Sequence, residues 1–465
     1  MSLVEQLRQL LGNTAVADDT ETLDQHSGDK WFAQARPDAV VFAESTEQVS
    51  RLMKFASGEN IAVTARGAGF GYVGSCVPIR AGVALSLARM NRIKDINFED
   101  AIAVVEPGVI TAEVKRAVRE KKLFYPPDPA SFEHCTIGGN VATNAGGPRC
   151  LKYGVTRNYV VGLEVVLANG EVLRTGGRVH KNKTGFDLIG LLVGSEGMLG
   201  VTTEIILKLL PLPPSRNTIS ASFSTMSEAA ATVQKIFALG FLPSSLEIAD
   251  HFTLEAARHD SGATHVPAGN AHLLVELDGQ EETVGVETGK VRDLVASRNP
   301  TTLEIAINEA ECERLWALRR QFSNSLRATG LTKLNEDIVV PRSRLVDLIQ
   351  FAEGLSARSG FPIACFGHAG DGNIHVNIMA DRYNREEVVR EKVRSALDQL
   401  FAQVLAWGGV ITGEHGIGLA KKRWWPDATS EVARALHQAI KRALDPDDIL
   451  NPGKFLDEEK SQGSA

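Results

Sequence analysis

Three glycine-rich stretches in the first half of the chain constrain its fold more than any other feature: 66–74, 135–147 and 194–200. The first follows an expected strand and contains the dinucleotide-binding fingerprint G-x-G-x-x-G at Gly69, Gly71 and Gly74. That fingerprint requires a helix to open at the third glycine. Here a further strand is expected at 82–87 instead, so we reject a Rossmann fold. Glycine still lets backbone amides approach a phosphate closely, so three such stretches favour a phosphate-bearing cofactor over ordinary turns.

The size and charge of the chain bound its class. At 465 residues it is too long for one ordinary core, so two or three packed units are expected. A net charge of -7 argues against a nucleic-acid-binding protein, which would normally carry an excess of basic residues. An acidic protein that handles an anion would need positive groups placed locally. Five cysteines that are never spaced as C-x-x-C argue against a disulfide framework or a zinc ribbon.

The N-terminus and the hydropathy pattern bear on location. The first residues alternate charged and apolar side chains at helical spacing, which is typical of a short amphipathic helix and not of a signal peptide. No apolar stretch approaches the roughly 18 to 20 residues that a spanning helix needs. We therefore expect a cytoplasmic protein, with peripheral docking at the inner membrane left open. Residues 457–465 are expected to form a disordered polar tail.

A proline-rich segment at 211–214 marks the expected boundary between two units. Before it, strands and helices surround the glycine-rich stretches, and Ala168-Asn-Gly-Glu171 predicts a hairpin turn. After it, strands alternate with longer helices, which is typical of a second α+β unit. The sequence thus predicts domains at 1–212 and 213–420 and a C-terminal segment at 421–465.

Two histidines, His368 and His375, flank a glycine-rich turn in the second half. The turn allows the backbone to reverse, and His375 and Asn377, two apart in an expected strand, share one face. Imidazoles bind divalent metals, and Glu414 is the obvious carboxylate for a third ligand. The adjacent His415 is a residue type suited to a general base near neutral pH. The alternative is a pair of structural histidines, which two imidazoles alone would favour.

An arginine-rich helix is expected after residue 310. Arg319 and Ser323 fall on one face of it. Arg319 could grip a carboxylate in a bidentate fork, with Ser323 adding a hydroxyl donor. Lys333 and Asn335, two apart in extended chain, give a similar weak signal. Taken alone, these residues favour a solvated helix and strand.

Six motifs, in order along the chain, carry a resemblance to a known family: Arg66-Gly-Ala-Gly, Pro126-Pro-Asp-Pro with Cys135-Thr-Ile-Gly-Gly-Asn, Lys183-Thr-Gly with Gly194-Ser-Glu-Gly, Gly367-His-Ala-Gly-Asp-Gly-Asn-Ile-His, Gly413-Glu-His-Gly-Ile-Gly, and Asn451-Pro-Gly-Lys. Together they resemble the FAD-dependent D-2-hydroxyacid dehydrogenases of the vanillyl-alcohol-oxidase type superfamily, which include D-lactate, glycolate and D-2-hydroxyglutarate dehydrogenases. The resemblance covers nearly the whole chain. It implies an α+β fold with a two-subdomain FAD-binding domain, an antiparallel-sheet substrate (cap) domain, and a C-terminal segment that returns to the FAD domain.

The resemblance also implies roles for individual residues. FAD would be bound by Arg66, Gly67, Ala68, Gly69, Phe70, Gly71, Pro129, Ser131, Thr136, Gly138, Gly139, Asn140, Thr143, Gly146, Glu196, Gly197, Gly200, Val201 and Asn451. A divalent metal, often zinc, would be held by His368, His375 and Glu414. Asn377 and Arg319 match substrate-binding positions, and Arg319 also counts as catalytic. His415 matches the catalytic base, and we add Ser323, Lys333 and Asn335 as substrate contacts.

The chain departs from the family in two places. Ala68 and Phe70 stand where relatives commonly have glycine and threonine, and the first loop contains no histidine, so non-covalent FAD is expected. Asn335 stands where the D-2-hydroxyglutarate members carry a lysine. This difference favours a smaller acid such as D-lactate, with D-2-hydroxyglutarate as the alternative.

These assignments give a hypothesis of function, the oxidation of a D-2-hydroxy acid to the 2-oxo acid. The metal would polarise the substrate hydroxyl, Arg319 would hold the carboxylate, His415 would remove the hydroxyl proton, and C2 would give hydride to flavin N5. Two alternatives stay open: a metal-independent enzyme of this fold acting on phenols or aldonolactones, and a flavin-free binding protein. The sequence identifies neither the metal nor the electron acceptor, whether quinone, cytochrome, electron-transfer flavoprotein or oxygen. A homodimer is compatible with it.

Overall fold

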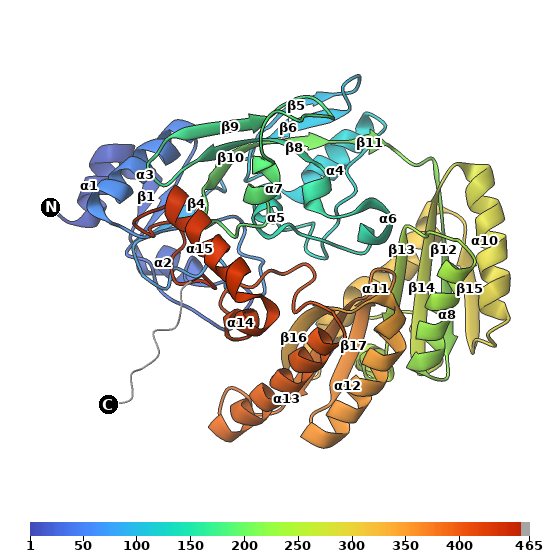
Figure 1. Ribbon diagram of the computed structural model, residues 1–465. Coiled ribbons are helices and arrows are strands. Elements are labelled where there is room, and N and C mark those ends of the chain that lie inside the picture. The colour runs from blue at the N-terminus through green and yellow to red at the C-terminus, as the bar shows by residue number, and fades with distance from the viewer. Residues whose placement is uncertain (457–465) are drawn as a thin grey trace. The chain divides into compact units, whose positions relative to one another are not determined.

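The computed structural model describes residues 1–456 and divides into two units (Figure 1). The first holds residues 1–146, 155–212 and the described residues from 414 onward, and the second holds 147–154 and 213–413. The break at 212/213 lies at the proline-rich segment, whereas the chain returns to the first unit at 414 and not at 421. The reason is that amides of 417–420 bond to Glu196 and Val73. The expected tail at 457–465 lies outside the described residues.

A four-stranded sheet begins the first unit. Its strands lie in the order β1 (Val16–Ala17), β2 (Ala39–Phe42), β4 (Val83–Ser86) and β3 (Val63–Arg66), and the last three are parallel. These strands share one apolar core with α1 (Leu3–Leu11) and α3 (Thr46–Glu59), near which lies α2 (Thr20–Gln25). Ser45 caps α3 by accepting a hydrogen bond from the backbone N–H of Gln48. Residues 67–82 join β3 to β4 without a helix, as expected when the Rossmann fold was rejected.

A five-stranded antiparallel sheet completes the first unit. Its order is β5 (Ile93–Asn97), β6 (Ile102–Val105), β10 (Val201–Lys208), β8 (Val160–Val166) and β9 (Val172–Gly176). The β8–β9 hairpin confirms the predicted turn. The remaining elements of this part are α4 (Thr111–Glu120), α7 (Leu188–Leu192), and the short pair β7 (Leu123–Phe124) and β11 (Leu210–Pro211).

The second glycine-rich stretch contains a helix that the sequence analysis did not predict. Helix α5 (Ile137–Thr143) begins after Thr136, whose hydroxyl accepts from the backbone N–H of Gly139 at 3.2 Å. Gly138 and Gly139 lie half-buried in the first turn of the helix, where the backbone N–H groups have no partner within the helix. Outside the helix, the N–H groups of Ile137 and Gly138 donate to the backbone oxygens of Val109 and Pro107 at 2.9 and 2.8 Å.

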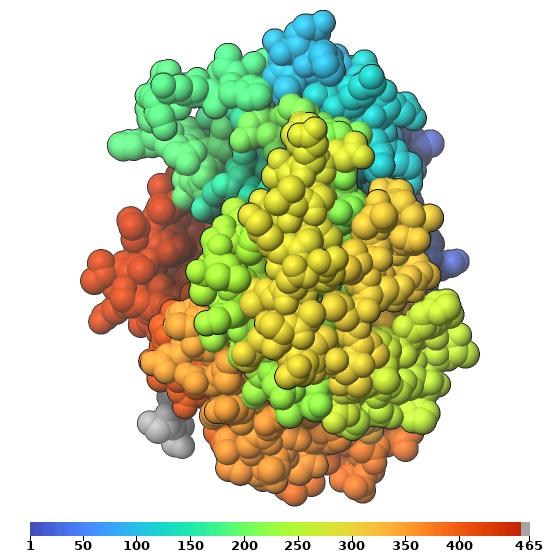
Figure 2. All heavy atoms as spheres, turned by 90° about the vertical axis from the view of Figure 1, so that its right-hand side faces the viewer, coloured from blue at the N-terminus to red at the C-terminus, as the bar shows by residue number. Residues whose placement is uncertain are grey.

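The second unit is built on one seven-stranded antiparallel sheet. Its order is β15 (Thr302–Ala306), β12 (Ser215–Phe223), β14 (Ala271–Gly279), β13 (Ser245–Ala249), β17 (Ile363–His368), β18 (Asn373–Ala380) and β16 (Thr332–Val339). One face is covered by α8 (Met226–Ala238), α10 (Glu281–Ala296), α12 (Leu345–Ser359) and α13 (Glu387–Ala406), and the other by α9 (His251–His259) and α11 (Glu309–Ala328) (Figure 1). Helix α10, yellow in Figure 2, lies on the surface in that view.

Short segments tie each unit together. Helix α6 (Cys150–Tyr153) joins the second unit because Arg149 pairs with Glu276 and Lys152 with Asp278. The C-terminal part of the first unit contains α14 (Trp425–Ala428) and α15 (Glu431–Leu444). No helix among residues 1–456 is long and apolar enough to cross a bilayer.

Candidate active site

The sheet face under α9 and α11 gathers polar side chains. The strand register places Glu247 opposite His368, Phe366 opposite His375, and His375 opposite Asp337. Residues directly opposite in a sheet project to the same face, so these side chains are neighbours. All of them are buried among the apolar side chains of the sheet and the two helices. Charged groups at such depth need partners, and their partners define the chemistry of this face.

Two of these residues, His368 and His375, form with Glu414 a group that could hold a metal ion. Each residue offers one ligand atom, and these atoms lie within 4.8 Å of one another. Nδ1 of His368 lies 2.7 Å from Oε1 of Glu247, so Nε2 is the ring nitrogen suited to a metal. Two imidazoles and one carboxylate form a ligand set typical of divalent ions such as zinc. The structure thus brings the three predicted ligands together, and the residues fit the ion.

The position of Glu414 follows from the chain itself. Gly413, the residue before it, donates its N–H to Oδ2 of Asp337 at 2.9 Å, and the hydroxyl of Thr412 lies 3.2 Å from the same oxygen. Asp337 lies opposite His375 in the sheet. The strand that pairs with the strand of His375 therefore also anchors the segment that leads to Glu414.

Glu247 links the metal cluster to the arginine of α11. Its Oε2 accepts from Nε of Arg319 at 2.6 Å, while its Oε1 faces His368. Burial raises the pKa of Glu247, but His368 and Arg319 outweigh burial, so the pKa lies below the usual value for a glutamate. A carboxylate that holds a ligand histidine fixes its tautomer and its orientation. Glu247 is thus the residue that orients His368.

Arg319 is buried and points from α11 to this face. Its guanidinium lies 5.0 Å from the centre of the Phe366 ring and is paired with Glu247. The carboxylate that Arg319 binds within the protein is that of Glu247. Its contact with a substrate stays a prediction.

Lys333 projects from β16 to the same face. Its Nζ lies 2.7 Å from Oγ of Ser323 and 5.6 Å from the centre of the Phe366 ring. Burial, together with the positive charges of Arg327 and Arg319, lowers the pKa of Lys333 to about 7. An anion arriving here would stabilise the ammonium form. The structure thus brings Lys333 and Ser323 into contact with each other.

Asn335 and Asn377 lie opposite each other on β16 and β18. Nδ2 of Asn377 donates to the backbone oxygens of Ala364 and His375 at 3.0 and 3.1 Å. Among the residues that the structure describes, none donates a hydrogen bond to Oδ1 of either asparagine, although both atoms are buried. A buried acceptor without a donor is costly, so a polar ligand or water fits here.

In the first unit, Glu196 ties several of the predicted FAD segments together. Its carboxylate accepts from the hydroxyl of Ser75 at 2.6 Å and from the N–H groups of Ile417 and Gly418 at 2.7 and 2.9 Å. Nδ2 of Asn451 donates to the backbone oxygens of Glu196 and Ser75 at 2.6 and 2.8 Å. Burial raises the pKa of Glu196, and the donors to its carboxylate oppose the rise. Segments that are distant in sequence therefore converge on this residue.

Close contacts explain two glycines of these segments. A Cβ on Gly67 would lie 2.4 Å from Oγ1 of Thr136, and a Cβ on Gly138 would lie 2.6 Å from Cβ of Pro107. The first and second glycine-rich stretches therefore touch, at positions where a side chain would collide. Glycines packed this closely are typical of segments where backbone approaches a phosphate-bearing group, so the two stretches are compatible with FAD.

The other predicted FAD residues take varied places. Arg66 donates to the backbone oxygens of Gly28 and Gln25 at 2.5 and 3.3 Å, so its guanidinium holds the neighbouring segment. A Cβ on Gly200 would lie 2.4 Å from the Val165 side chain, and Val201 begins β10. The rest lie in or beside the same segments: Ala68, Gly69, Phe70, Gly71, Pro129, Ser131, Gly139, Asn140, Thr143, Gly146 and Gly197.

His415, the predicted base, belongs to the first unit and follows Glu414 in the chain. Its Nε2 lies 3.6 Å from Oε1 of Glu414, and its ring centre lies 5.3 Å from that of Tyr72. The predicted base is therefore adjacent to a predicted metal ligand through the chain itself.

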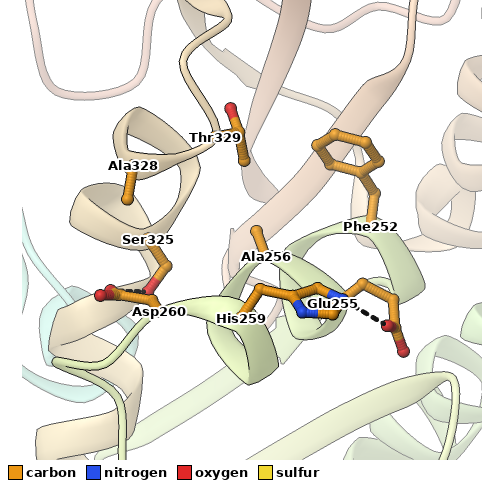
Figure 3. A pocket seen from close by; sticks show the side chains of 8 residues that line it. All are labelled: Phe252, Glu255, Ala256, His259, Asp260, Ser325, Ala328 and Thr329. Atoms are coloured by element: carbon orange, nitrogen blue, oxygen red, sulfur yellow. Dashed lines mark hydrogen bonds and ion pairs between the residues drawn. The ribbon is translucent and has the colours of Figure 1, made fainter.

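A cavity of about 300 Å³ in the second unit lies apart from all predicted site residues (Figure 3). It opens between α9 and α11 and is lined by Phe252, Glu255, Ala256, His259, Asp260, Ser325, Ala328 and Thr329. Asp260 is held by Ser325 at 2.7 Å, and Glu255 is paired with Arg258. Its acidic groups therefore already have partners within the protein.

Sequence analysis missed three carboxylates that support the predicted sites, of which Glu247 and Asp337 are buried and Asp29 is half-buried. Glu247 orients His368, Asp337 anchors the segment before Glu414, and Asp29 accepts the N–H of Gly74 at 2.8 Å in the first glycine-rich stretch. Glu247 had one available signal, because it is a lone acid inside an apolar strand. A buried charge of that kind needs a partner.

Comparisons with known proteins bear on the family and the fold. A family model described as FAD linked oxidases, C-terminal domain, matches residues 212–455, and one described as FAD binding domain matches 37–176. The chain is 40% identical to the glycolate oxidase subunit GlcD of Bacillus subtilis (strain 168), over 91% of this chain and 90% of the relative. It is 33% identical to D-lactate dehydrogenase of Anaerostipes hadrus over the same shares. A crystal structure of p-cresol methylhydroxylase with substrate bound has a TM-score of 0.79, at 21% identity, covering 97% of this chain and 96% of that one.

Proposed function

The chain belongs to the FAD-linked oxidases of the vanillyl-alcohol-oxidase type, and on that premise we propose that it oxidises a D-2-hydroxy acid, with D-lactate as first choice, using a divalent metal such as zinc. Its relatives are FAD-linked oxidoreductases, so it is an enzyme of hydroxyacid oxidation. The observation that carries the metal proposal is the cluster of His368, His375 and Glu414 on a buried sheet face beside cationic side chains.

Each bound group supplies a distinct chemistry. FAD, when bound, accepts two electrons, and the metal acts as a Lewis acid on substrate oxygens. The protein's own part is to bind, orient and deprotonate the acid. Glu247 keeps His368 oriented, and Asp337 keeps the segment of Glu414 in place.

The cations of this face provide the local positive charge that an acidic protein needs for an anionic substrate. Arg319 is balanced by Glu247, whereas Lys333 is bonded to the neutral hydroxyl of Ser323. Lys333 is thus the cation that gains most from an arriving carboxylate. Oδ1 of Asn377 suits a hydroxyl donor of the substrate.

His415 is the proposed acceptor of the hydroxyl proton. An imidazole has an ordinary pKa of about 6.5, which suits proton transfer near neutral pH. Glu414, 3.6 Å away, and the ring of Tyr72 limit the positions that the imidazole can take. Its place beside a metal ligand puts the base next to a hydroxyl that the metal would hold.

A second candidate substrate is a D-2-hydroxy diacid such as D-2-hydroxyglutarate. The observation that favours it is Lys333, which the register of β16 and β18 places on the same face as Asn377. A second cation beside Arg319 would suit a second carboxylate. Lys333 thus partly offsets the preference for a small acid that Asn335 gives, and D-lactate stays the first choice.

Anaerobic bleaching of the flavin against a panel of acids tests the proposal. D-lactate or D-2-hydroxyglutarate should bleach the purified yellow protein, and their L enantiomers should not. Removing the metal with a chelator should stop bleaching without loss of the yellow colour, and added zinc should restore it. Bleaching by phenols or aldonolactones, or full activity in metal-free protein, would contradict the proposal.

A further inference from the structure

Helix α15 presents its apolar side chains to solvent. Val432 is 80% exposed and Leu436 60% exposed, and Ala435, Ala439 and Ala443 are exposed as well. With 3.6 residues per turn, these five positions form one stripe along the 14-residue helix. An amphipathic surface helix normally turns such a stripe to the core. Here the stripe faces solvent. Figure 1 shows α15 in red.

The opposite, polar face of α15 fixes this orientation. Lys441 is only 7% exposed and donates to the backbone oxygens of Met198 and Leu450 at 3.0 and 2.7 Å. It also forms an ion pair of 2.5 Å with Asp445. Rotating the helix to bury the apolar stripe would separate the ammonium group of Lys441 from these partners, which is costly for a buried charge. The helix is therefore held with its apolar stripe outward.

The charges beside the stripe have a self-complementary arrangement. Glu431 and Arg442 are both exposed, and neither forms an ion pair within residues 1–456. They are eleven residues apart, close to three helical turns, so they lie on the same flank of the stripe at opposite ends. Under a two-fold axis perpendicular to the helix, each of these residues would face the other type on a second copy.

We propose that α15 is the contact surface of a homodimer, in which two copies pair antiparallel across the apolar stripe. Leu436 of one copy would pack against Ala439 of the other, and the alanines, spaced four apart, let the two backbones approach closely. Glu431 would pair with Arg442 of the second copy at both ends. The charge pattern favours a second copy over an unrelated partner, because Glu431 and Arg442 of one copy are complementary to Arg442 and Glu431 of another.

The contact is small. A pair of helices of this length covers less than the roughly 800 Å² per partner of a standard interface. The dimer should therefore be weak and should form in a concentration-dependent way. This inference does not rest on the proposed substrate or metal.

Sedimentation velocity of the full-length, FAD-loaded protein over a wide concentration range tests it. The wild type should shift from monomer to dimer. Leu436→Glu should weaken the dimer by about 100-fold or more, because it places a charge in the apolar centre. Val286→Glu, at a residue 59% exposed on α10, is the matched control and should leave the dimer unchanged.

Charge reversal tests the antiparallel register. Glu431→Arg and Arg442→Glu should each weaken the dimer by about tenfold, because each sets like charges face to face. The double variant should restore it. An unchanged flavin spectrum in each variant shows that the fold is kept. A double variant as weak as the single ones, a wild type that stays monomeric throughout, or binding of that monomer to phosphatidylglycerol vesicles would overturn the proposal.

Discussion

The two regions that carry the predicted chemistry are built in opposite ways. In the first unit, the predicted FAD segments consist largely of glycine-rich backbone. The carboxylate of Glu196 holds them together by accepting hydrogen bonds from a hydroxyl and from backbone N–H groups. In the second unit, the sheet face is shaped by charged side chains that hold one another, above all Glu247 between His368 and Arg319. The glycine-rich segments of the first unit, called the backbone-built region, should be sensitive to an added side chain. The sheet face with Glu247, His368 and Arg319, called the charge-built region, should be sensitive to the loss of one partner of an ion pair. Each can therefore be damaged without the other.

The largest effect should come from His415→Ala, which removes the proposed base and leaves both regions built as before. The rate of anaerobic flavin reduction by substrate should fall by about 10²- to 10⁴-fold, since that is the usual contribution of a general base. The protein should stay yellow and folded. Stopped-flow absorbance of the flavin measures the rate. His259→Ala, at a side chain 84% exposed, is the control and should be silent. Rapid reduction of the His415 variant would place the base elsewhere.

Glu247→Gln tests the charge-built region. The change keeps the shape but removes the charge that orients His368 and balances Arg319. Metal affinity, measured by competition with a chromophoric chelator, should fall by about 10- to 100-fold. Flavin content should not change. Excess metal should recover part of the activity.

A matched control separates orientation from simple loss of stability. Glu276 is also a fully buried glutamate on this sheet, paired with Arg149 and Arg216 and bonded to Nε1 of Trp316. Glu276→Gln should destabilise the fold in a similar way, because it also leaves buried arginines without their partner. Its metal affinity should match the wild type. Equal loss of metal affinity in both variants would show that Glu247 has no special role.

Gly138→Ala tests the backbone-built region, with a smaller effect. The new Cβ would meet Pro107, with its nearest contact at 2.6 Å, so the start of α5 must shift. FAD affinity should fall several-fold, measured by calorimetry on the apoprotein, while metal affinity stays unchanged. Gly58→Ala in α3 is the control, because nothing lies within 4 Å of its Cβ position. It should keep FAD affinity and gain about 0.5–1 kcal/mol in stability. Full FAD affinity in the Gly138 variant would remove that glycine from the site.

The same contrast explains how far the sequence could predict the molecule. Glycine clusters and the proline-rich break are local signals, so the two units and the β8–β9 hairpin were predictable. Helix α5 was not, because glycines in its first turn hide a helix that depends on the Thr136 cap. Glu247 and Asp337 were missed because their roles depend on strand pairings between residues distant in sequence. The pairing of Arg319 with Glu247 was missed for the same reason.

The smallest effect concerns pH and Lys333, a buried cation of the sheet face that is bonded to the hydroxyl of Ser323 and, within residues 1–456, forms no ion pair with a carboxylate. Its pKa is lowered to about 7 by burial and by Arg327 and Arg319. As pH rises through 7 the ammonium is lost, so KM for the acid should rise a few-fold between about pH 6 and pH 9. Lys333→Met should have the higher KM at every pH and lack this dependence on the lysine.

Stability should move in the opposite sense. Between about pH 7 and the ordinary lysine pKa of about 10.4, the unfolded chain binds more protons at Lys333 than the folded one, so the wild type becomes more stable as pH rises. Lys333→Met removes the buried charge, and its stability advantage in urea should be largest at pH 6 and shrink towards pH 10. An advantage that stays constant with pH, together with a KM profile identical to wild type, would show that Lys333 neither titrates near 7 nor meets the substrate.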